Sequence, residues 1–151
     1  MITRLHKLQQ PLSMIKSKFE DLYIGQKASL QKTFTDADVK LFAGISTDVN
    51  PLHISDEFAK NSIFGKRVVH GMLSASLISA VLANVLPGPG TIYLGQELKF
   101  TAPVYLGDDV KAELTVIEIR EDKHIVKLQS NCYNQDGKMV IEGVSTVKFN
   151  G

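Results

Sequence analysis

Apolar and polar residues alternate along most of the second half of the chain. Four runs show this alternation, over residues 91–100, 110–120, 125–134 and 139–149, and a shorter run covers residues 27–34. Turn-forming segments separate them: Pro103 with Gly107, a charged stretch at 121–123, and the pair Asp136-Gly137, which is typical of a hairpin. Strands with one face against a core alternate in this way, so the pattern predicts an antiparallel sheet.

The first half of the chain shows helical spacing instead. Apolar residues at helical intervals follow Thr35, and the carboxylate of Asp38 completes a capping-box signal. We therefore expect a helix over Thr35–Ser46. A second short helix is expected to begin at Ser55 and to end before Gly65.

The longest apolar stretch, residues 68–86, contains no Asp, Glu, Lys or Arg. It is just long enough to span a membrane, but its histidine, serines and asparagine favour a buried helix of a soluble domain. We expect this helix from about His70 to Leu86, ended by Pro87-Gly88-Pro89-Gly90. One buried helix and a meander of strands predict a single α+β domain with the sheet curled around the helix.

Composition narrows the classes of function. The chain has 151 residues, 44% hydrophobic and 22% charged, which fits one globular domain. Its net charge of +1 gives no reason to expect a nucleic-acid partner. The single cysteine, Cys132, cannot form an internal disulfide and is expected to be buried filler, and no Cys/His spacing suggests a metal. A reducing, intracellular setting is expected.

The N-terminal residues 1–20 are basic, with no acidic residue before Glu20. We expect them to form an extension that precedes a domain spanning residues 21–151. A mitochondrial transit peptide is the alternative, although this segment has few arginines.

The segment Asp48-Val49-Asn50-Pro51-Leu52-His53 brings together a carboxylate, a carboxamide and an imidazole. The Asn-Pro pair indicates a turn, since proline fixes its own φ and restricts its predecessor. Such a turn, without a helix or strand, can hold Asp48 and His53 side by side to share one water or one substrate proton. A simpler interpretation is that Asp48 caps the helix near Ser55 and that His53 only packs.

Gly71 lies in the first turn of the expected long helix, where glycine costs stability relative to alanine. Glycine permits another group to approach the backbone closely. The first N–H groups of a helix have no intrahelical partner and lie at the positive end of its dipole. An oxygen-binding site at the Gly71 N–H is therefore predicted.

These segments resemble the MaoC-like (R)-specific enoyl-CoA hydratases of the hot-dog fold, and especially the short bacterial hydratases that supply polyhydroxyalkanoate synthesis. The resemblance rests on residues 42–53, which contain the Asp-x-Asn-Pro-x-His segment, on Val69-His70-Gly71-Met72-Leu73, and on Ile92-Tyr93-Leu94-Gly95-Gln96. It runs from about Thr33 to the C-terminus. The family usually has glycine just before the aspartate, where this chain has Thr47.

The resemblance implies a hot-dog fold and the reversible addition of water to trans-2-enoyl-CoA, giving (3R)-3-hydroxyacyl-CoA. Asp48 and His53 would activate one water, and the Gly71 N–H would stabilise the thioester oxyanion. A hot-dog acyl-CoA thioesterase and a non-catalytic acyl-CoA-binding module are the alternatives.

The resemblance also implies supporting residues. Asn50 would fix the Asp48 loop or the water, Ser79 would lie near the active site, and His70 would pack or cap at the start of the helix. The basic residues Lys66 and Arg67 would either meet coenzyme A phosphates or simply be solvated.

No cofactor and no metal are expected, because coenzyme A arrives as part of the substrate. A homodimer is expected, since a hot-dog sheet leaves an edge and a face to be covered. Neither nucleic acid nor membrane is an expected partner. The expected location is the cytoplasm, with the mitochondrion as the alternative.

Overall fold

The structure is a computed structural model that describes residues 17–151. Its helices are the short 3-10 helix η3 (Phe19–Asp21), α1 (Asp36–Ser46), α2 (Pro51–Ile54), α3 (Asp56–Lys60) and α4 (Gly71–Asn84). Its strands are β1 (Lys27–Thr33), β2 (Ile92–Phe100), β3 (Asp109–Arg120), β4 (Ile125–Tyr133) and β5 (Met139–Lys148). The predicted strands begin and end within one or two residues of these bounds.

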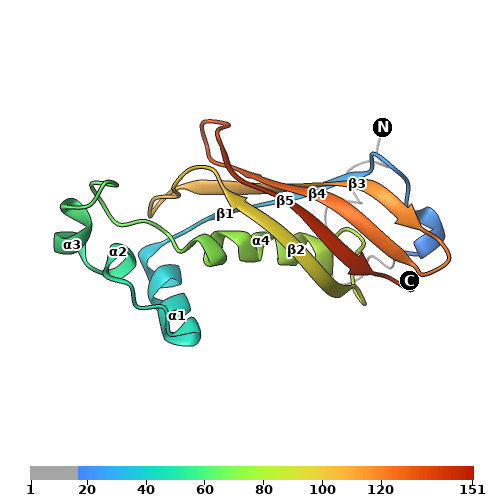
Figure 1. The fold of residues 1–151 in the computed structure, drawn as a ribbon, viewed down its shortest axis with the longest axis horizontal. Coiled ribbons are helices and arrows are strands. Elements are labelled where there is room, and N and C mark those ends of the chain that lie inside the picture. Colours follow the sequence, from blue (N-terminus) through green and yellow to red (C-terminus); the bar gives the residue numbers. More distant parts are fainter. Residues whose placement is uncertain (1–16) are drawn as a thin grey trace, which may run out of the picture.

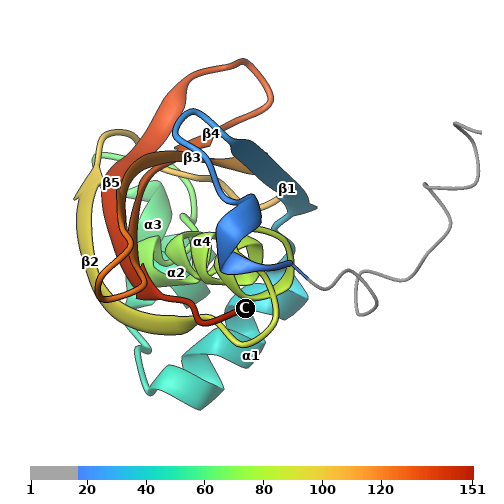
Figure 2. The same ribbon diagram turned by 90° about the vertical axis from the view of Figure 1, so that its right-hand side faces the viewer.

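The five strands form one antiparallel sheet in the order β1-β3-β4-β5-β2. The sheet curls around α4, which lies along its concave face (Figure 2). The predicted α+β domain, with its sheet wrapped around one long helix, is confirmed. Helices α1 to α3 lie together beyond the N-terminal end of α4 (Figure 1).

The core lies between α4 and the sheet. Ile78 and Val81 of α4 and Val110 and Leu128 of the strands have no exposed surface. The expected buried helix is not covered on every side, because Met72 is 60% exposed and other residues on the same side are open as well. Among residues 17–151 of a single chain, α4 therefore keeps one uncovered face.

Helix α1 begins as its sequence predicts. The Thr35 hydroxyl accepts a hydrogen bond from the Asp38 N–H, and the Asp38 carboxylate accepts one from the Thr35 N–H. This reciprocal capping box fixes where α1 starts. Helix α1 ends at Ser46, and its C-cap residue, Thr47, immediately precedes Asp48.

The expectation that His53 lies in a turn outside any helix is wrong. His53 belongs to α2, a single helical turn with Pro51 as its first residue. Asn50 caps this turn, since its side-chain oxygen accepts a hydrogen bond from the Leu52 N–H at 3.0 Å. Ser55 caps α3 in the same way, so Asp48 is not the cap of that helix.

The domain boundary expected at residue 20 stays a prediction, although one residue before it packs into the core. Phe19 is 7% exposed, belongs to the hydrophobic core and stacks on His124 with ring centroids 4.0 Å apart. The packed domain therefore includes Phe19. Residues 1–16, most of the expected extension, lie outside the described part of the chain.

Strand β2 forms one edge of the sheet. Its residues Ile92, Leu94 and Phe100 are each about half exposed, although their alternation resembles that of a strand facing a core.

Within residues 17–151, no helix combines the length and the apolar character that crossing a bilayer requires.

Candidate active site

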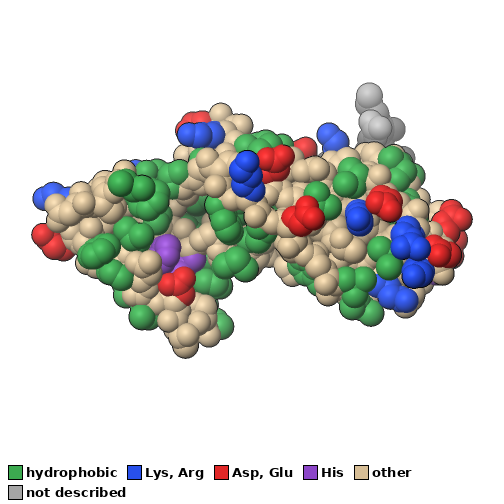
Figure 3. Space-filling model, viewed as in Figure 1, with side chains coloured by type: hydrophobic (Ala, Val, Ile, Leu, Met, Phe, Trp, Pro, Cys, Tyr) green, Lys and Arg blue, Asp and Glu red, His purple; other side chains and the backbone are tan. Residues whose placement is uncertain are grey.

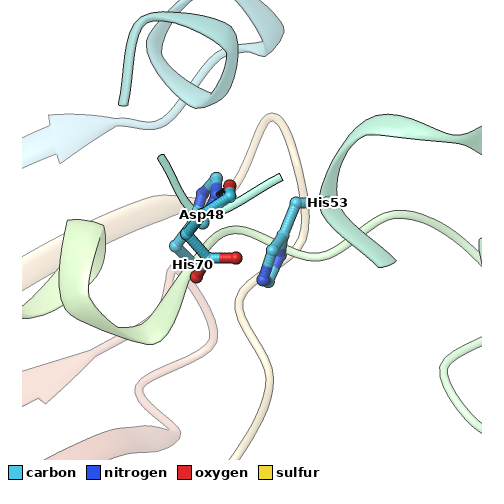
Figure 4. A group of neighbouring side chains, drawn as sticks. All are labelled: Asp48, His53 and His70. Carbon is cyan, nitrogen blue, oxygen red and sulfur yellow. Dashed lines mark hydrogen bonds between the residues drawn. The ribbon is translucent and has the colours of Figure 1, made fainter. Parts of the chain in front are cut away.

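Residues 68–70, which lead into α4, run beside residues 48–53 and are tied to them by hydrogen bonds. The Val68 N–H donates to the Leu52 carbonyl at 3.2 Å. The rings of His53 and His70 add two more bonds across the same junction, described below. Two segments that are separate in sequence are thus held in register, and Asp48, His53 and His70 meet there (Figure 4).

The loop that presents Asp48 is fixed by its own side chains. Thr47 adopts a left-handed conformation with φ of 65°, which turns the chain out of α1. The Ser46 hydroxyl accepts a hydrogen bond from the Asp48 N–H, and one Asp48 carboxylate oxygen accepts one from the Asn50 N–H at 3.2 Å. Asn50 thus contributes its main-chain N–H to the loop and does not line the cavity of the site, and its functional role stays a prediction.

The His53 ring is held in one tautomer. Its Nδ1 lies 2.8 Å from the Val68 carbonyl oxygen. A carbonyl can only accept, so Nδ1 carries the hydrogen and Nε2 keeps its lone pair. The ring and the Asp48 carboxylate face each other in Figure 4, and both line the same cavity.

His70 is the most buried member of the group, at 1% exposed. Its Nε2–H donates to the Asp48 carbonyl at 2.9 Å, and its ring stacks on that of His53 with centroids 3.9 Å apart. It occupies the cap position of α4 but makes no side-chain capping bond, so the packing role is the one observed. Its Nδ1 has no partner among the described residues.

Three possible ligand atoms, one each from Asp48, His53 and His70, lie within 4.8 Å of one another. Such a group could in principle hold a metal ion. The two rings, however, are stacked with their planes only 26° apart. An ion in the plane of one ring would lie well outside the plane of the other, whereas ring nitrogens bind metals in the ring plane. The arrangement suits proton transfer better, and the expectation of no metal stays a prediction.

Gly71 begins α4 beside this group. Its N–H has no hydrogen-bond partner among the described residues, as expected for the first residue of a helix. A Cβ at this position would lie 2.7 Å from Cε1 of Phe100. Glycine at this position thus allows the aromatic ring of Phe100 to lie close to the main chain.

The site opens on a cavity of about 540 Å³ between the start of α4 and the segment that follows β2. Its lining is mostly apolar, with Val69, Val104 and Ile141 among the wall residues. Figure 3 shows histidine side chains beside an acidic one in a hollow on this face. A mostly apolar cavity with polar groups at one end fits an acyl chain with a reacting head group.

Phe100 and Ser74 are among the lining residues that the sequence did not predict as site residues. Phe100 closes the cavity over Gly71, and Ser74 contributes a hydroxyl that is buried without a hydrogen-bond partner. Only the spacing of Ser74, one helical turn after Gly71, could have suggested it. Ser79, expected near the site, is exposed and does not line the cavity. At 1.5 Å per residue it lies about 12 Å along α4 from Gly71.

The chain was compared with known protein families and structures. The MaoC-like domain family matches residues 22–135. An (R)-specific enoyl-CoA hydratase from Rhodospirillum rubrum is 49% identical over 134 residues, covering 89% of this chain and 92% of that protein.

Two solved structures are also similar. The (R)-hydratase of Aeromonas caviae involved in PHA biosynthesis is 47% identical with a TM-score of 0.84, covering 86% of this chain and 98% of that one. The R-hydratase PhaJ1 from Pseudomonas aeruginosa, in its unliganded form, is 46% identical with a TM-score of 0.83, covering 87% of this chain and 84% of that one.

Proposed function

This chain belongs to the MaoC-like domain family, and we propose that it is an (R)-specific enoyl-CoA hydratase. The enzyme is a hydro-lyase that adds water reversibly across the double bond of a trans-2-enoyl-CoA and gives the (3R)-3-hydroxyacyl-CoA. The observation that carries this function is that Asp48 and His53 line a mostly apolar cavity together with Gly71, whose N–H has no partner among residues 17–151.

Asp48 and His53 are proposed to hold the reacting water between them. Their polar atoms lie within 4.8 Å of each other, and two hydrogen bonds of about 2.8 Å each reach across such a gap. The lone pair on His53 Nε2 can take a proton as the water oxygen attacks C3, and the same pair of groups returns a proton to C2. Proton transfer by positioned groups typically supplies ~10²–10⁴-fold in rate.

The Gly71 N–H is proposed to receive the negative charge that develops on the thioester oxygen. Attack at C3 pushes electrons through the conjugated system to that oxygen, which then needs a donor. The first N–H of α4 has no partner in the described part of the chain and lies at the positive end of the helix dipole. One such donor typically contributes roughly 3–4 kcal/mol to transition-state stabilisation.

Asn50 and His70 are proposed to act on the geometry of the reacting pair. Asn50 shapes the loop through its N–H bond to the Asp48 carboxylate and by capping α2. His70 contacts both partners, one through its ring face and the other through Nε2. Neither needs to touch the substrate for this role.

We propose that the enzyme works as a homodimer. Strand β2 presents an unpaired edge with Ile92 and Leu94 half exposed, and the exposed face of α4 carries Met72 and Ser79. A second copy could cover both surfaces, because edges and apolar faces of this kind favour pairing. Sedimentation at assay concentration should give the mass of two chains, and a fully active monomer would exclude the dimer.

No resident cofactor or metal is needed for the proposed chemistry, since coenzyme A is part of the substrate. Full activity after dialysis against a chelator would support this.

We propose a cytoplasmic location, with the mitochondrion as the alternative. The buried, unpaired thiol of Cys132 supports a reducing compartment.

The function is tested by incubating the purified protein with trans-2-enoyl-CoA esters. Loss of the conjugated-thioester absorbance, with (3R)-3-hydroxyacyl-CoA as product and no free thiol, is expected. Release of free coenzyme A would indicate a thioesterase instead. Ligand-induced stabilisation without any turnover would indicate an acyl-CoA-binding module.

A further inference from the structure

Arg67 precedes the segment that leads into α4, and its guanidinium makes hydrogen bonds to two other parts of the protein. Its Nε–H donates to the main-chain carbonyl of His53 at 2.7 Å, and its Nη2 lies 2.6 Å from Asp36 Oδ1. The side chain is only 10% exposed. Arg67 therefore bridges α1, which begins at Asp36, and α2, which carries His53.

The carbonyl that Arg67 binds is one that α2 cannot satisfy. The last carbonyls of a helix lack intrahelical partners, and α2 is a single turn in which His53 is the next-to-last residue. A turn this short has almost no intrinsic stability. Its position thus depends on outside contacts, and the Arg67 bond is one of them.

The imidazole of His53 depends on the residue next to Arg67. Its Nδ1–H donates to the carbonyl of Val68, so consecutive residues hold the main chain and the ring of His53. A shift of Arg67 away from α2 would alter both bonds. The pKa of the Asp36 carboxyl is held below its usual value by hydrogen bonds from Lys40 and then from Arg67, which keeps this anchor charged.

We propose that Arg67 is a positioning residue that sets the place of the His53 imidazole in the active site. The predicted effect of Arg67 on kcat rests on the proposed hydration activity. The positioning role also replaces the expectation that Arg67 meets coenzyme A phosphates, because the side chain is largely buried and its guanidinium bonds His53 and Asp36. Lys66 differs, with its ammonium 4.4 Å over the ring of Tyr105.

The kinetic test compares Arg67→Met with a matched control, Lys40→Met. Lys40 pairs with the same Asp36 carboxylate at 2.8 Å, but no hydrogen bond joins it to His53 within the described residues. Arg67→Met should lower kcat about tenfold or more with KM within about twofold, since misplacing a reacting group by an ångström costs this much. Lys40→Met should leave both constants near wild type.

Arg67→Lys should recover part of kcat. A lysine ammonium can reach either the His53 carbonyl or Asp36, but it lacks the fork that reaches both. A phosphate-binding role predicts the opposite split, with KM raised and kcat kept. That result would overturn the proposal.

The ring of His53 gives a readout that needs no turnover. Nitrogen NMR of the imidazole should report the Nδ1–H tautomer in the wild type and in Lys40→Met, and a mixture of tautomers or a shifted resonance in Arg67→Met. If the wild type does not hydrate enoyl-CoA, the proposed function fails, and this spectrum still decides the role of Arg67. An unchanged His53 spectrum in folded Arg67→Met would contradict the positioning role of Arg67.

Discussion

The imidazole rings of His53 and His70 stack with centroids 3.9 Å apart, while the Nε2–H of His70 donates to the carbonyl of Asp48. One buried ring therefore contacts both members of the proposed catalytic pair. Because His70 stands at the start of α4, the spacing of Asp48 and His53 is tied to the same helix that offers the Gly71 N–H. Acid-base groups and oxyanion donor are thus placed by one element.

Thr47 should be replaceable by glycine with a gain in stability. Its φ of 65° is a conformation that costs a β-branched residue roughly 1–2 kcal/mol, and glycine removes this strain from the folded state. Glycine also raises the conformational entropy of the unfolded chain, which offsets part of the gain. Thr47→Gly should raise the free energy of unfolding by about 0.5–1 kcal/mol in urea titrations. Hydration activity should stay near wild type, and a destabilised variant would show that the Thr47 side chain has a role of its own.

Gly71→Ala should impair catalysis without weakening the fold. The added Cβ would lie 2.7 Å from the Phe100 ring, which is 51% exposed and free to turn. The ring would then be displaced at the cavity, while alanine favours the helix by about 1 kcal/mol. We expect kcat/KM to fall at least about tenfold with an unchanged melting temperature.

Phe100→Ala provides the matched test of that explanation. Removing the ring removes the clash, so the double variant should be more active than Gly71→Ala alone, a coupling that distant sites do not show. If the loss of activity in the double variant equals the product of the losses in the two single variants, displacement of Phe100 does not explain the effect of Gly71→Ala.

Replacing either of two buried serines by alanine should change the melting temperature, in opposite directions. The Ser74 hydroxyl has no partner among the described residues, whereas that of Ser130 bonds the hydroxyl of Ser145 at 2.5 Å. An unpaired buried hydroxyl costs about 1–3 kcal/mol, and a paired one contributes roughly 1 kcal/mol. Ser74→Ala should thus raise the melting temperature and Ser130→Ala should lower it. Equal losses in the two would indicate that Ser74 is satisfied by an ordered water.

Much of this fold is encoded locally and could be predicted. The capping box of Thr35 and Asp38 defines the start of α1 through contacts three residues apart. Alternation placed the strands to within one or two residues, because period two is what a half-buried strand requires. Asp48 and His53 could be paired because they lie in one short segment.

What could not be predicted depends on contacts between distant segments. Nothing near His70 in the sequence indicates that its ring stacks on His53, and nothing near Gly71 points to Phe100. The single-turn helix α2 is too short to leave a periodic pattern, so His53 was expected in a turn. The exposed face of α4 was misjudged because apolar residues alone do not say whether a neighbour covers them.

Cys132 should be unreactive in the folded protein. Burial raises the pKa of its thiol to about 12, so at pH 8 only roughly one thiol in ten thousand is the reactive thiolate. A disulfide reagent such as dithionitrobenzoate should modify the protein only in denaturant, and Cys132→Ser should keep full activity. Rapid labelling of the native protein would contradict the burial of this side chain.

The proposed pair should behave as one unit. Asp48→Asn and His53→Ala should each lower hydration about 10²–10⁴-fold, which corresponds to roughly 3–5 kcal/mol in the barrier. Because both groups would act on the same water, the double variant should be little worse than the worse single one. Losses that multiply would indicate two independent roles.

The most direct test of the active site is the rate of loss of enoyl-thioester absorbance with purified Asp48→Asn. Asparagine keeps the shape of Asp48 and can still accept the Asn50 N–H, so circular dichroism should match the wild type. We predict a folded protein whose hydration rate is at least about a hundredfold lower. A folded Asp48→Asn variant that hydrates at nearly the wild-type rate would show that Asp48 only shapes its loop and takes no part in the reaction.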